Sequence, residues 1–267
     1  MQFPPSPARS FCIKHYLFLK SKHAGPLRLF SDGNTGMVFT LRGQLKILKK
    51  GSQDTEILPD VFVYGQVHRY HDIFSRAETE LLIVVFQPYG YFSLSGIPAD
   101  ELKGRIIDAD LIFGSQIFSL MDALGAAISY ERSISLIENY FSSVLKNTKS
   151  TDRLLSPIVR IVIQSKGQIA VSQLTKLTSY SERQLERLFN QAVGLSPLKY
   201  LQIVRLHHFL SLIRSTNNTA TFTTAGLESG YYDQPHLIHN FKQITGLTPT
   251  QYLSTAGTLA VNLVIVN

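Results

Sequence analysis

The stretch Phe189–Leu201 reads FNQAVGLSPLKYL, and Phe241–Leu253, which begins 52 residues later, reads FKQITGLTPTQYL. Seven of the thirteen positions are identical, and Ser196 of the first copy is matched by Thr248 of the second. A recurrence of this kind is typical of a repeated supersecondary unit. In each copy we expect a helix that ends at a glycine, followed by a Ser or Thr cap and a proline that opens the next helix.

Capping signals extend this helical pattern through the C-terminal part of the chain. The expected helices run from Ser156-Pro157 to near Gly167, from Ser172, from Ser181 to Gly194, from Ser196-Pro197 to about Arg214, near Thr224–Ser229, over Asp233–Thr245 and from Thr248-Pro249. Gly194, Pro197, Gly230, Gly246 and Pro249 are the residues that set the ends of these helices.

The charge of the 267 residues is uneven. Residues 1–150 carry 16 Lys/Arg and 14 Asp/Glu, a balance of +2, whereas residues 151–267 carry 10 and 5, a balance of +5. The second part is positive because acidic residues are scarce in it. The positive electrostatic field of this part suits a polyanionic partner. A basic soluble domain without such a partner would have the same composition.

Length and cysteine content limit the class of protein. The length favours two domains, each with its own core. Cys12 is the only cysteine, so an internal disulfide and classical zinc-finger spacing are excluded, and a reducing cytoplasm is expected. We find no signal peptide and no apolar run of about 20 residues that would span a membrane. The apolar stretch 259–266 is expected to pack on a neighbouring element as a strand or short helix.

The first 95 residues are predicted to form strands. Short β-branched and aromatic stretches alternate with turn dipeptides, a pattern typical of a barrel or jelly roll. The expected strands include Gly36–Leu41, Gln44–Leu48, Val61–Tyr64 and Leu81–Phe86. Apolar residues then fall at helical spacing between 114 and 146, which predicts two helices, and 146–153 is polar enough to be a linker.

A short helix, a tight turn and a second helix with an exposed polar face would form a helix-turn-helix, whose second helix fits the DNA major groove. Arg bonds guanine O6 and N7, Glu accepts from cytosine N4, and Gln and Asn suit adenine. The exposed positions are expected to be Arg183, Glu186 and Arg187 in the first unit and Gln234, His236, His239 and Asn240 in the second, with Lys242 on a phosphate. Each unit alone would also fit a solvated face of an ordinary helical bundle.

Residues 156–255 resemble the DNA-binding region of AraC-type transcriptional regulators. LTKLTSYSERQLERLFNQAVGLSPLKYL matches the first unit and AGLESGYYDQPHLIHNFKQITGLTPTQYL the second, which is the signature segment of the family. The resemblance implies an all-α module whose two recognition helices enter successive major grooves. The base-facing positions of the family fall on Arg183, Glu186 and Arg187, then on Gln234, Pro235, His236 and His239.

Val84–Leu102 is similar to a segment that follows the barrel in some of these regulators, and this implies a cupin-like N-terminal domain. The resulting organisation is an α+β chain in two domains. We expect a cupin-like sensor or dimerisation domain at 1–112, a helical pair and linker at 113–150, a DNA-binding domain with two helix-turn-helix units at 151–256, and an apolar tail at 257–267. The barrel would bind a small molecule or pair two chains.

The sequence therefore predicts a cytoplasmic, sequence-specific regulator of transcription that binds double-stranded DNA, contacts RNA polymerase if it activates, and is neither an enzyme nor dependent on a cofactor. A cupin-type metal enzyme with a helical appendage is the alternative. His68 and His71 could suggest a metal, but on one strand residues three apart lie on opposite faces, so we expect none there. A further alternative is a helical module that binds another protein.

Overall fold

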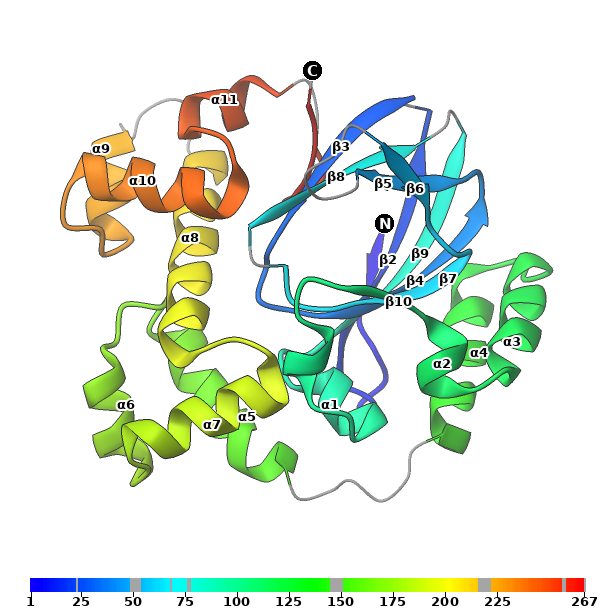
Figure 1. Cartoon of the computed structure of the whole chain (residues 1–267), viewed down its shortest axis with the longest axis horizontal. Helices are drawn as coiled ribbons and strands as arrows, with labels where there is room; N and C mark the ends of the chain where they lie inside the picture. The colour runs from blue at the N-terminus through cyan, green and yellow to red at the C-terminus, as the bar shows by residue number, and fades with distance from the viewer. Residues whose placement is uncertain are drawn as a thin grey trace.

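The computed structural model describes residues 1–22, 24–48, 54–67, 69–75, 78–144, 151–215, 222–255 and 258–266. Strands fill most of its N-terminal part and helices most of its C-terminal part, so the chain is an α+β protein in two parts (Figure 1). In these ranges no helix has the length and apolar character needed to cross a bilayer.

The described strands form two antiparallel six-stranded sheets that face each other. They are β1 (Gln2–Phe3), β2 (Ile13–Ser21), β3 (Gly25–Phe30), β4 (Gly36–Arg42), β5 (Leu45–Leu48), β6 (Thr55–Ile57), β7 (Val61–Tyr64), β8 (Tyr70–Ser75), β9 (Thr79–Phe86), β10 (Ile106–Asp108), β11 (Thr258–Ala260) and β12 (Leu263–Ile265). The first sheet has the order β1-β2-β9-β4-β7-β10 and the second β11-β12-β3-β8-β5-β6. Between these described strands the two sheets are not joined into a closed barrel.

The helices follow β9 in sequence, with β10 between η1 and α2 and with β11 and β12 after the last helix. They are α1 (Gly90–Ser95), the 3-10 helix η1 (Ala99–Leu102), α2 (Ala109–Phe113), α3 (Gln116–Gly125), α4 (Tyr130–Val144), α5 (Thr151–Gln164), α6 (Val171–Thr178), α7 (Glu182–Val193), α8 (Pro197–Ser215), α9 (Phe222–Glu228), α10 (Gln234–Thr245) and α11 (Pro249–Ser254). Helices α3 and α4 confirm the helical pair that the periodicity between 114 and 146 predicts.

Side chains of the first sheet serve two separate cores because neighbouring residues of a strand point to opposite faces. On β9, Leu82 and Val84 pack against α1–α4, where Phe86 and Phe141 meet edge to face at 6.0 Å. Leu81 and Ile83 point the other way, into the space between the sheets. The first sheet is therefore covered by helices on one side and faces a partner sheet on the other.

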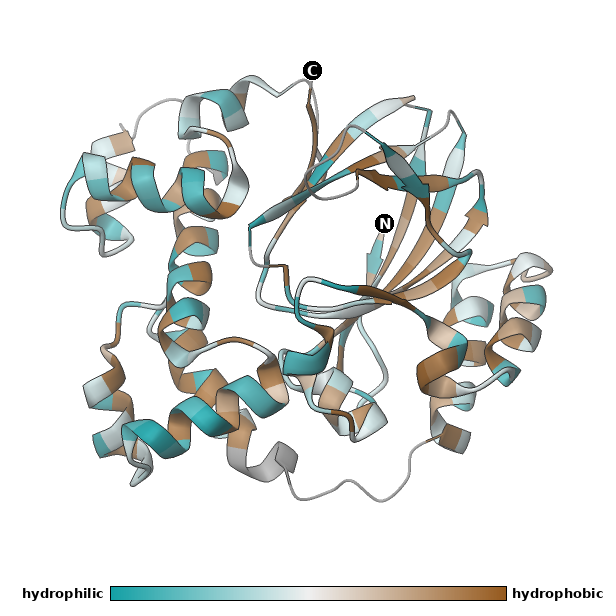
Figure 2. Cartoon of the chain, in the orientation of Figure 1, coloured by the Kyte–Doolittle hydropathy of each residue, from teal (hydrophilic) through white to brown (hydrophobic). Residues whose placement is uncertain are grey.

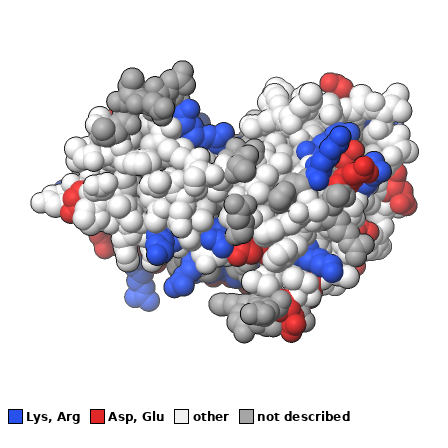
Figure 3. Space-filling model, turned by 90° about the horizontal axis from the view of Figure 1, so that it is seen from above, with Lys and Arg blue, Asp and Glu red and all other residues white. Residues whose placement is uncertain are grey.

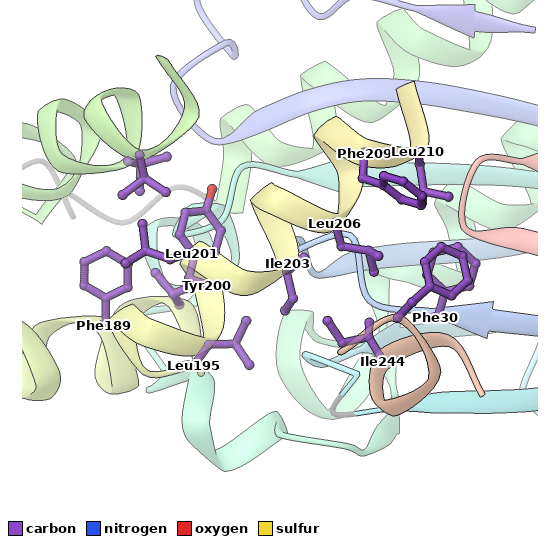
Figure 4. Close-up of a cluster of buried hydrophobic side chains, with 14 of the residues drawn as sticks. Phe30, Phe189, Leu195, Tyr200, Leu201, Ile203, Leu206, Phe209, Leu210 and Ile244 are labelled. Carbon is purple, nitrogen blue, oxygen red and sulfur yellow. The ribbon is translucent and has the colours of Figure 1, made fainter. Parts of the chain in front are cut away.

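The helical core surrounds α8 (Figure 4). Ile203, Leu206 and Phe209 are fully buried, and α8 carries apolar side chains toward both ends of the helical half. The packing of this core explains why the sequence repeats. The Phe and Tyr of each copy form the same aromatic pair. Phe189 lies 5.9 Å from Tyr200, and Phe241 lies 5.9 Å from Tyr252.

The two halves are in contact through helices and through strands. Helix α7 packs against η1 and α1, and α10 packs against β3. The C-terminal residues return to the second sheet, where β12 pairs antiparallel with β3 and β11 pairs with β12. The apolar tail is thus a strand pair, which is one of the two forms that its composition predicts. Phe30, at the end of β3, belongs to the helical core.

Two helix starts differ from the sequence prediction. Helix α5 begins at Thr151, more than a turn before Pro157, so Ser156 does not cap it. Proline removes one helical hydrogen bond, but burial of Leu155, Ile158 and Val159 favours continuing the helix through it. Helix α6 begins at Val171 and not after Ser172, because the Gln173 side chain already accepts a hydrogen bond from the Ala170 N–H at 2.9 Å.

Candidate functional site

The first polar helix face belongs to α7, which follows the short α6 after a tight turn. Ser179 in this turn has a φ of 57°, the left-handed conformation. Ser181 caps α7: its Oγ accepts from the Gln184 N–H at 3.3 Å, and Gln184 Oε1 accepts from the Ser181 N–H at 2.8 Å. This reciprocal capping box fixes where α7 begins, and so which of its residues face outward.

The exposed face of α7 carries the residues that the sequence predicts. Leu185 and Phe189 are fully buried, whereas Arg183, Glu186 and Arg187 are exposed. Figure 2 shows α7 as a largely hydrophilic helix over its visible surface. The two arginine side chains are therefore free to reach a ligand outside the protein.

The second polar face belongs to α10, which follows α9 in the same way. Asp233 caps α10, and its Oδ1 accepts from the His236 N–H at 2.7 Å. Leu237 and Phe241 are buried. The exposed residues of this helix include Gln234, Pro235, His236, His239 and Lys242. Pro235 lies in the first turn, where the missing N–H would have no helical partner.

Asn240 does not belong to this exposed face. Its side chain is 5% exposed, and its Oδ1 accepts a hydrogen bond from the Tyr231 hydroxyl at 3.0 Å. The prediction that Asn240 reads bases is thus corrected. It follows His239 by one residue, about 100° around the helix, and this rotation turns it from the outer face to the core.

We predict that Asn240→Ala lowers the free energy of unfolding by about 1–3 kcal/mol, because it leaves the buried Tyr231 hydroxyl without its acceptor. His239→Ala is the matched control and should change it by less than about 0.5 kcal/mol, since His239 is exposed. Urea unfolding followed by circular dichroism measures both. A wild-type stability for Asn240→Ala would contradict the structural role given to this residue.

The predicted helix-end residues set where the helices around α8 begin and end. Gly194, Gly230 and Gly246 have φ values of 79°, 80° and 72°, which side chains other than glycine rarely adopt. Pro197 and Pro249 open α8 and α11. Figure 1 shows α7 beside one end of α8 and α10 beside the other. The 19 residues of α8 span roughly 28 Å at 1.5 Å per residue.

The charge on the face seen in Figure 3 is mixed. On the sheet-rich half some Lys and Arg side chains adjoin Asp and Glu side chains, and on the helical half several Lys and Arg side chains lie along one edge. The exposed charged residues of the two polar faces include Arg183, Glu186, Arg187 and Lys242.

A second candidate site is a cavity of about 660 Å³ between the two sheets. Its walls are mostly apolar side chains from both sheets, such as Leu19, Val38 and Ile73, and residues of α8 and of the C-terminal segment also line it. Its polar lining residues include Gln2, Lys14, His15, Asp32, Asn34, Tyr64, His71, Gln87, Arg105, Tyr200, His207, Arg214 and Asn262.

Two of the cavity histidines, His15 and His207, have lowered pKa values, which favours their neutral form. Burial lowers the pKa of His15 to about 4, with Lys14 adding to the shift and Asp32 opposing it. Burial also lowers the pKa of His207, and Asp32 again opposes the shift. His207 Nε2 lies 2.9 Å from the Ser31 carbonyl oxygen. Because a carbonyl only accepts, this nitrogen carries the proton, and the ring ties α8 to the N-terminal half.

Sequence reasoning did not identify this cavity. Its lining residues come from strands and helices scattered over most of the chain, and apolar strand residues carry no signal that separates a cavity wall from a filled core. In the part of the chain that the structure describes, no three His, Cys, Asp or Glu side chains are grouped as metal ligands would be. His71 lines the cavity, and His68 lies outside the described residues.

Comparison with known families divides the chain as the fold does. Residues 174–255 match a family described as a helix-turn-helix domain, and residues 1–108 match a domain of unknown function, DUF6597. An uncharacterised HTH-type transcriptional regulator of Haemophilus influenzae is 27% identical over 210 residues, which are 78% of this chain and 66% of the relative. The HTH-type transcriptional activator RhaR of Escherichia coli is 29% identical over 113 residues, 42% of this chain and 39% of RhaR.

These alignments span less than two thirds of the length of the curated relatives. Among solved structures, ToxT from Vibrio cholerae is similar with a TM-score of 0.50 and 12% identity, covering 89% of this chain and 96% of ToxT. A second ToxT structure, with a TM-score of 0.50 and 11% identity, is bound to (E)-4-(8-methylnaphthalen-1-yl)but-3-enoic acid. At this identity the likeness concerns the fold, in which a sheet-rich N-terminal part precedes a helical C-terminal part.

Proposed function

Because the chain belongs to the AraC-type transcriptional regulators, we propose that it binds double-stranded DNA at specific sequences and regulates transcription in the cytoplasm, under the control of a small molecule. The observation that carries this proposal is the pair of capped helices, α7 and α10, whose polar faces are exposed at opposite ends of α8. Such an arrangement lets one protein read two successive major grooves.

In this proposal α6–α7 and α9–α10 are two helix-turn-helix units, and α7 and α10 are their recognition helices. Arg183 and Arg187 bind guanine, Glu186 accepts from cytosine, and Gln234 binds adenine. Pro235, His236 and His239 face the bases beside Gln234, and Lys242 contacts a phosphate. Contacts to phosphate supply most of the affinity and make it sensitive to salt, whereas contacts to bases supply the specificity.

In this proposal residues 1–112, which supply both facing sheets except β11 and β12, are a cupin-like sensor domain, and the cavity between the sheets is the effector site. Its volume is in the range of small-molecule sites, and its mostly apolar walls favour an effector that is itself largely apolar. The small organic acid carried by one ToxT structure supports a small-molecule ligand for this chain too. The helices within 114–146, α3 and α4, would pair two chains, residues 151–256 would bind DNA, and RNA polymerase would be the partner if the protein activates.

The test is binding to DNA fragments selected from the genome of the source organism with the purified protein. Arg187→Ala should lower affinity for the selected site by about 1–3 kcal/mol and relax one base position. Arg160→Ala, which removes an exposed arginine of α5, is the matched control and should leave base preference unchanged. An equal loss on random and selected DNA for Arg187→Ala would contradict base reading, and salt-insensitive or absent DNA binding by the wild type would contradict the function.

A further inference from the structure

The C-terminal strand β12 joins the DNA-binding half to the edge of the second sheet. Leu263 pairs with Leu29, Val264 with Arg28, and Ile265 with Leu27. Asn262 adds two hydrogen bonds to Phe30: its carbonyl accepts from the Phe30 N–H at 3.0 Å, and its Nδ2 donates to the Phe30 carbonyl at 3.1 Å. The chain segment that leaves α11 is thus fastened to a strand of the opposite domain.

The two faces of this strand belong to different cores. Leu263 is 7% exposed and packs in the core between the sheets, whereas Val264 is fully buried in the helical core. Ile265 continues the first face and Val266 the second. Since side chains alternate along a strand, any shift of β12 disturbs both cores at once.

The same segment forms part of the cavity wall. The lining residues it contributes are Leu259, Ala260, Val261, Asn262 and Leu263. If β12 left β3, these residues would leave the wall with it. The cavity can therefore be fully enclosed on this side only while the strand is paired.

Helix α11 links this strand to the second polar face. The Tyr252 hydroxyl donates to the Val261 carbonyl at 3.0 Å. The Tyr252 ring is 6.1 Å from Phe30 of β3 and 5.9 Å from Phe241 of α10. One buried side chain thus contacts the C-terminal segment, the sheet and the recognition helix.

A second link lies directly beside the strand pairing. Arg28, the partner of Val264, forms a bidentate ion pair with Asp72 at 2.7 and 2.8 Å and lies over the Tyr70 ring at 3.9 Å. Its Nη1 also donates to the Gly246 carbonyl, at the end of α10, at 3.3 Å. Strand β3 therefore holds both β12 and the C-terminal end of α10.

We propose that β12 is a strap that couples the effector cavity to the second DNA-reading unit. While it is paired with β3, the strap closes the cavity and holds α10 and α11 against the sensor domain; when it detaches, the cavity opens and α10 and α11 are released. An apolar ligand in the cavity gains contacts with Leu259 and Leu263 only in the paired state, so it shifts the equilibrium toward that state. This inference rests on the proposed function for the identity of the cavity and of α10.

A reversible cross-link tests the strap directly. Leu29→Cys with Leu263→Cys places two thiols at paired positions of antiparallel strands, where Cα atoms about 4.5–5.5 Å apart lie within the range of a disulfide. The one native cysteine, Cys12, is buried. Each single-cysteine variant, treated with the same oxidant, controls for the loss of a leucine and for oxidation itself.

The first readout is amide hydrogen exchange, measured by mass spectrometry in the oxidised and reduced forms. Exchange in α10 and α11 should be slower in the oxidised form by roughly 5- to 150-fold, the range of a typical coupling, with no change in α6 and α7. Val264→Ala should speed exchange in α10 and α11, whereas Ile57→Ala, on β6 at a residue 57% exposed and outside the cavity wall, should not. Equal exchange in the oxidised and reduced forms would overturn the coupling.

The second readout is uptake of 1-anilinonaphthalene-8-sulfonate, an apolar fluorescent probe, by the same two forms. The oxidised protein should take up the probe more slowly than the reduced protein, and the single-cysteine variants should not respond to the oxidant. Equal uptake by both forms, including none by either, would overturn the gating role. Neither readout uses DNA, so a failure of DNA binding would overturn the proposed function while the two readouts still decide whether the strap exists.

Discussion

Replacing Phe209 by alanine should lower the free energy of unfolding by about 3–5 kcal/mol, the range found when a fully buried aromatic side chain is truncated. Phe209 has no exposed surface and lies on the inner face of α8. Its ring meets Tyr231 at 6.3 Å and Phe241 at 6.0 Å, both edge to face. The alanine variant leaves a void that α8, held at both ends by packed helices, cannot collapse to fill.

Leu198→Ala is the matched control for Phe209→Ala. Leu198 lies on the same helix but is 58% exposed, so its truncation should cost less than about 0.5 kcal/mol. Urea unfolding monitored by far-ultraviolet circular dichroism measures both variants. A loss below about 1 kcal/mol for Phe209→Ala would mean that the core around α8 can relax, and that α8 is not the rigid connection between the two polar faces.

The helix ends of the C-terminal half could be predicted from the sequence because local chemistry sets them. Ser181 and Asp233 cap their helices with side-chain oxygens, and Gly194 and Gly246 end them in the left-handed conformation. Each of these effects acts within about four residues. The same kinds of capping residue occur in both copies of the repeat, so each copy independently predicts the same helix ends.

Asn240 and Pro157 differ from their sequence predictions because packing outweighs a local preference. Residue type alone makes Asn240 a candidate for adenine contact, but its helical position turns it toward the Tyr231 hydroxyl. Pro157 is typical of a helix start, yet the apolar residues around it extend the helix on both sides. In both cases burial of one helix face against the core outweighs the preference of the single residue.

The sequence predicts that the C-terminal segment is a strand or a short helix, but it does not predict which strand it pairs with. The apolar run ending at Val266 indicates a strand or short helix, but its partner β3 lies more than 200 residues away in the chain. Alternation tells which residues share a face and not which strand lies next to them. The cavity escaped prediction for the same reason, because its walls come from elements distant in sequence.

The largest effect on DNA binding is expected for Arg187→Ala combined with Gln234→Ala. The two residues lie on different helices, α7 and α10, beside opposite ends of α8, so their losses should add. Each bidentate base contact contributes about 1–3 kcal/mol of discrimination, and the pair should therefore weaken binding to the selected site by about 2–6 kcal/mol. Fluorescence anisotropy at fixed salt, with both single variants alongside, measures the sum.

Whether the two losses of affinity add shows whether both units, or only the first, read bases. If only the first unit reads bases, Gln234→Ala will bind the selected site like the wild type, and the double variant will match Arg187→Ala. A duplex shortened to the half-site of the first unit gives the internal control, because on it Gln234→Ala should have no effect while Arg187→Ala keeps its full loss. Additive losses on the long duplex and a single loss on the short one require both polar faces to contact the same DNA molecule, which is possible only if α8 holds them about one duplex turn apart.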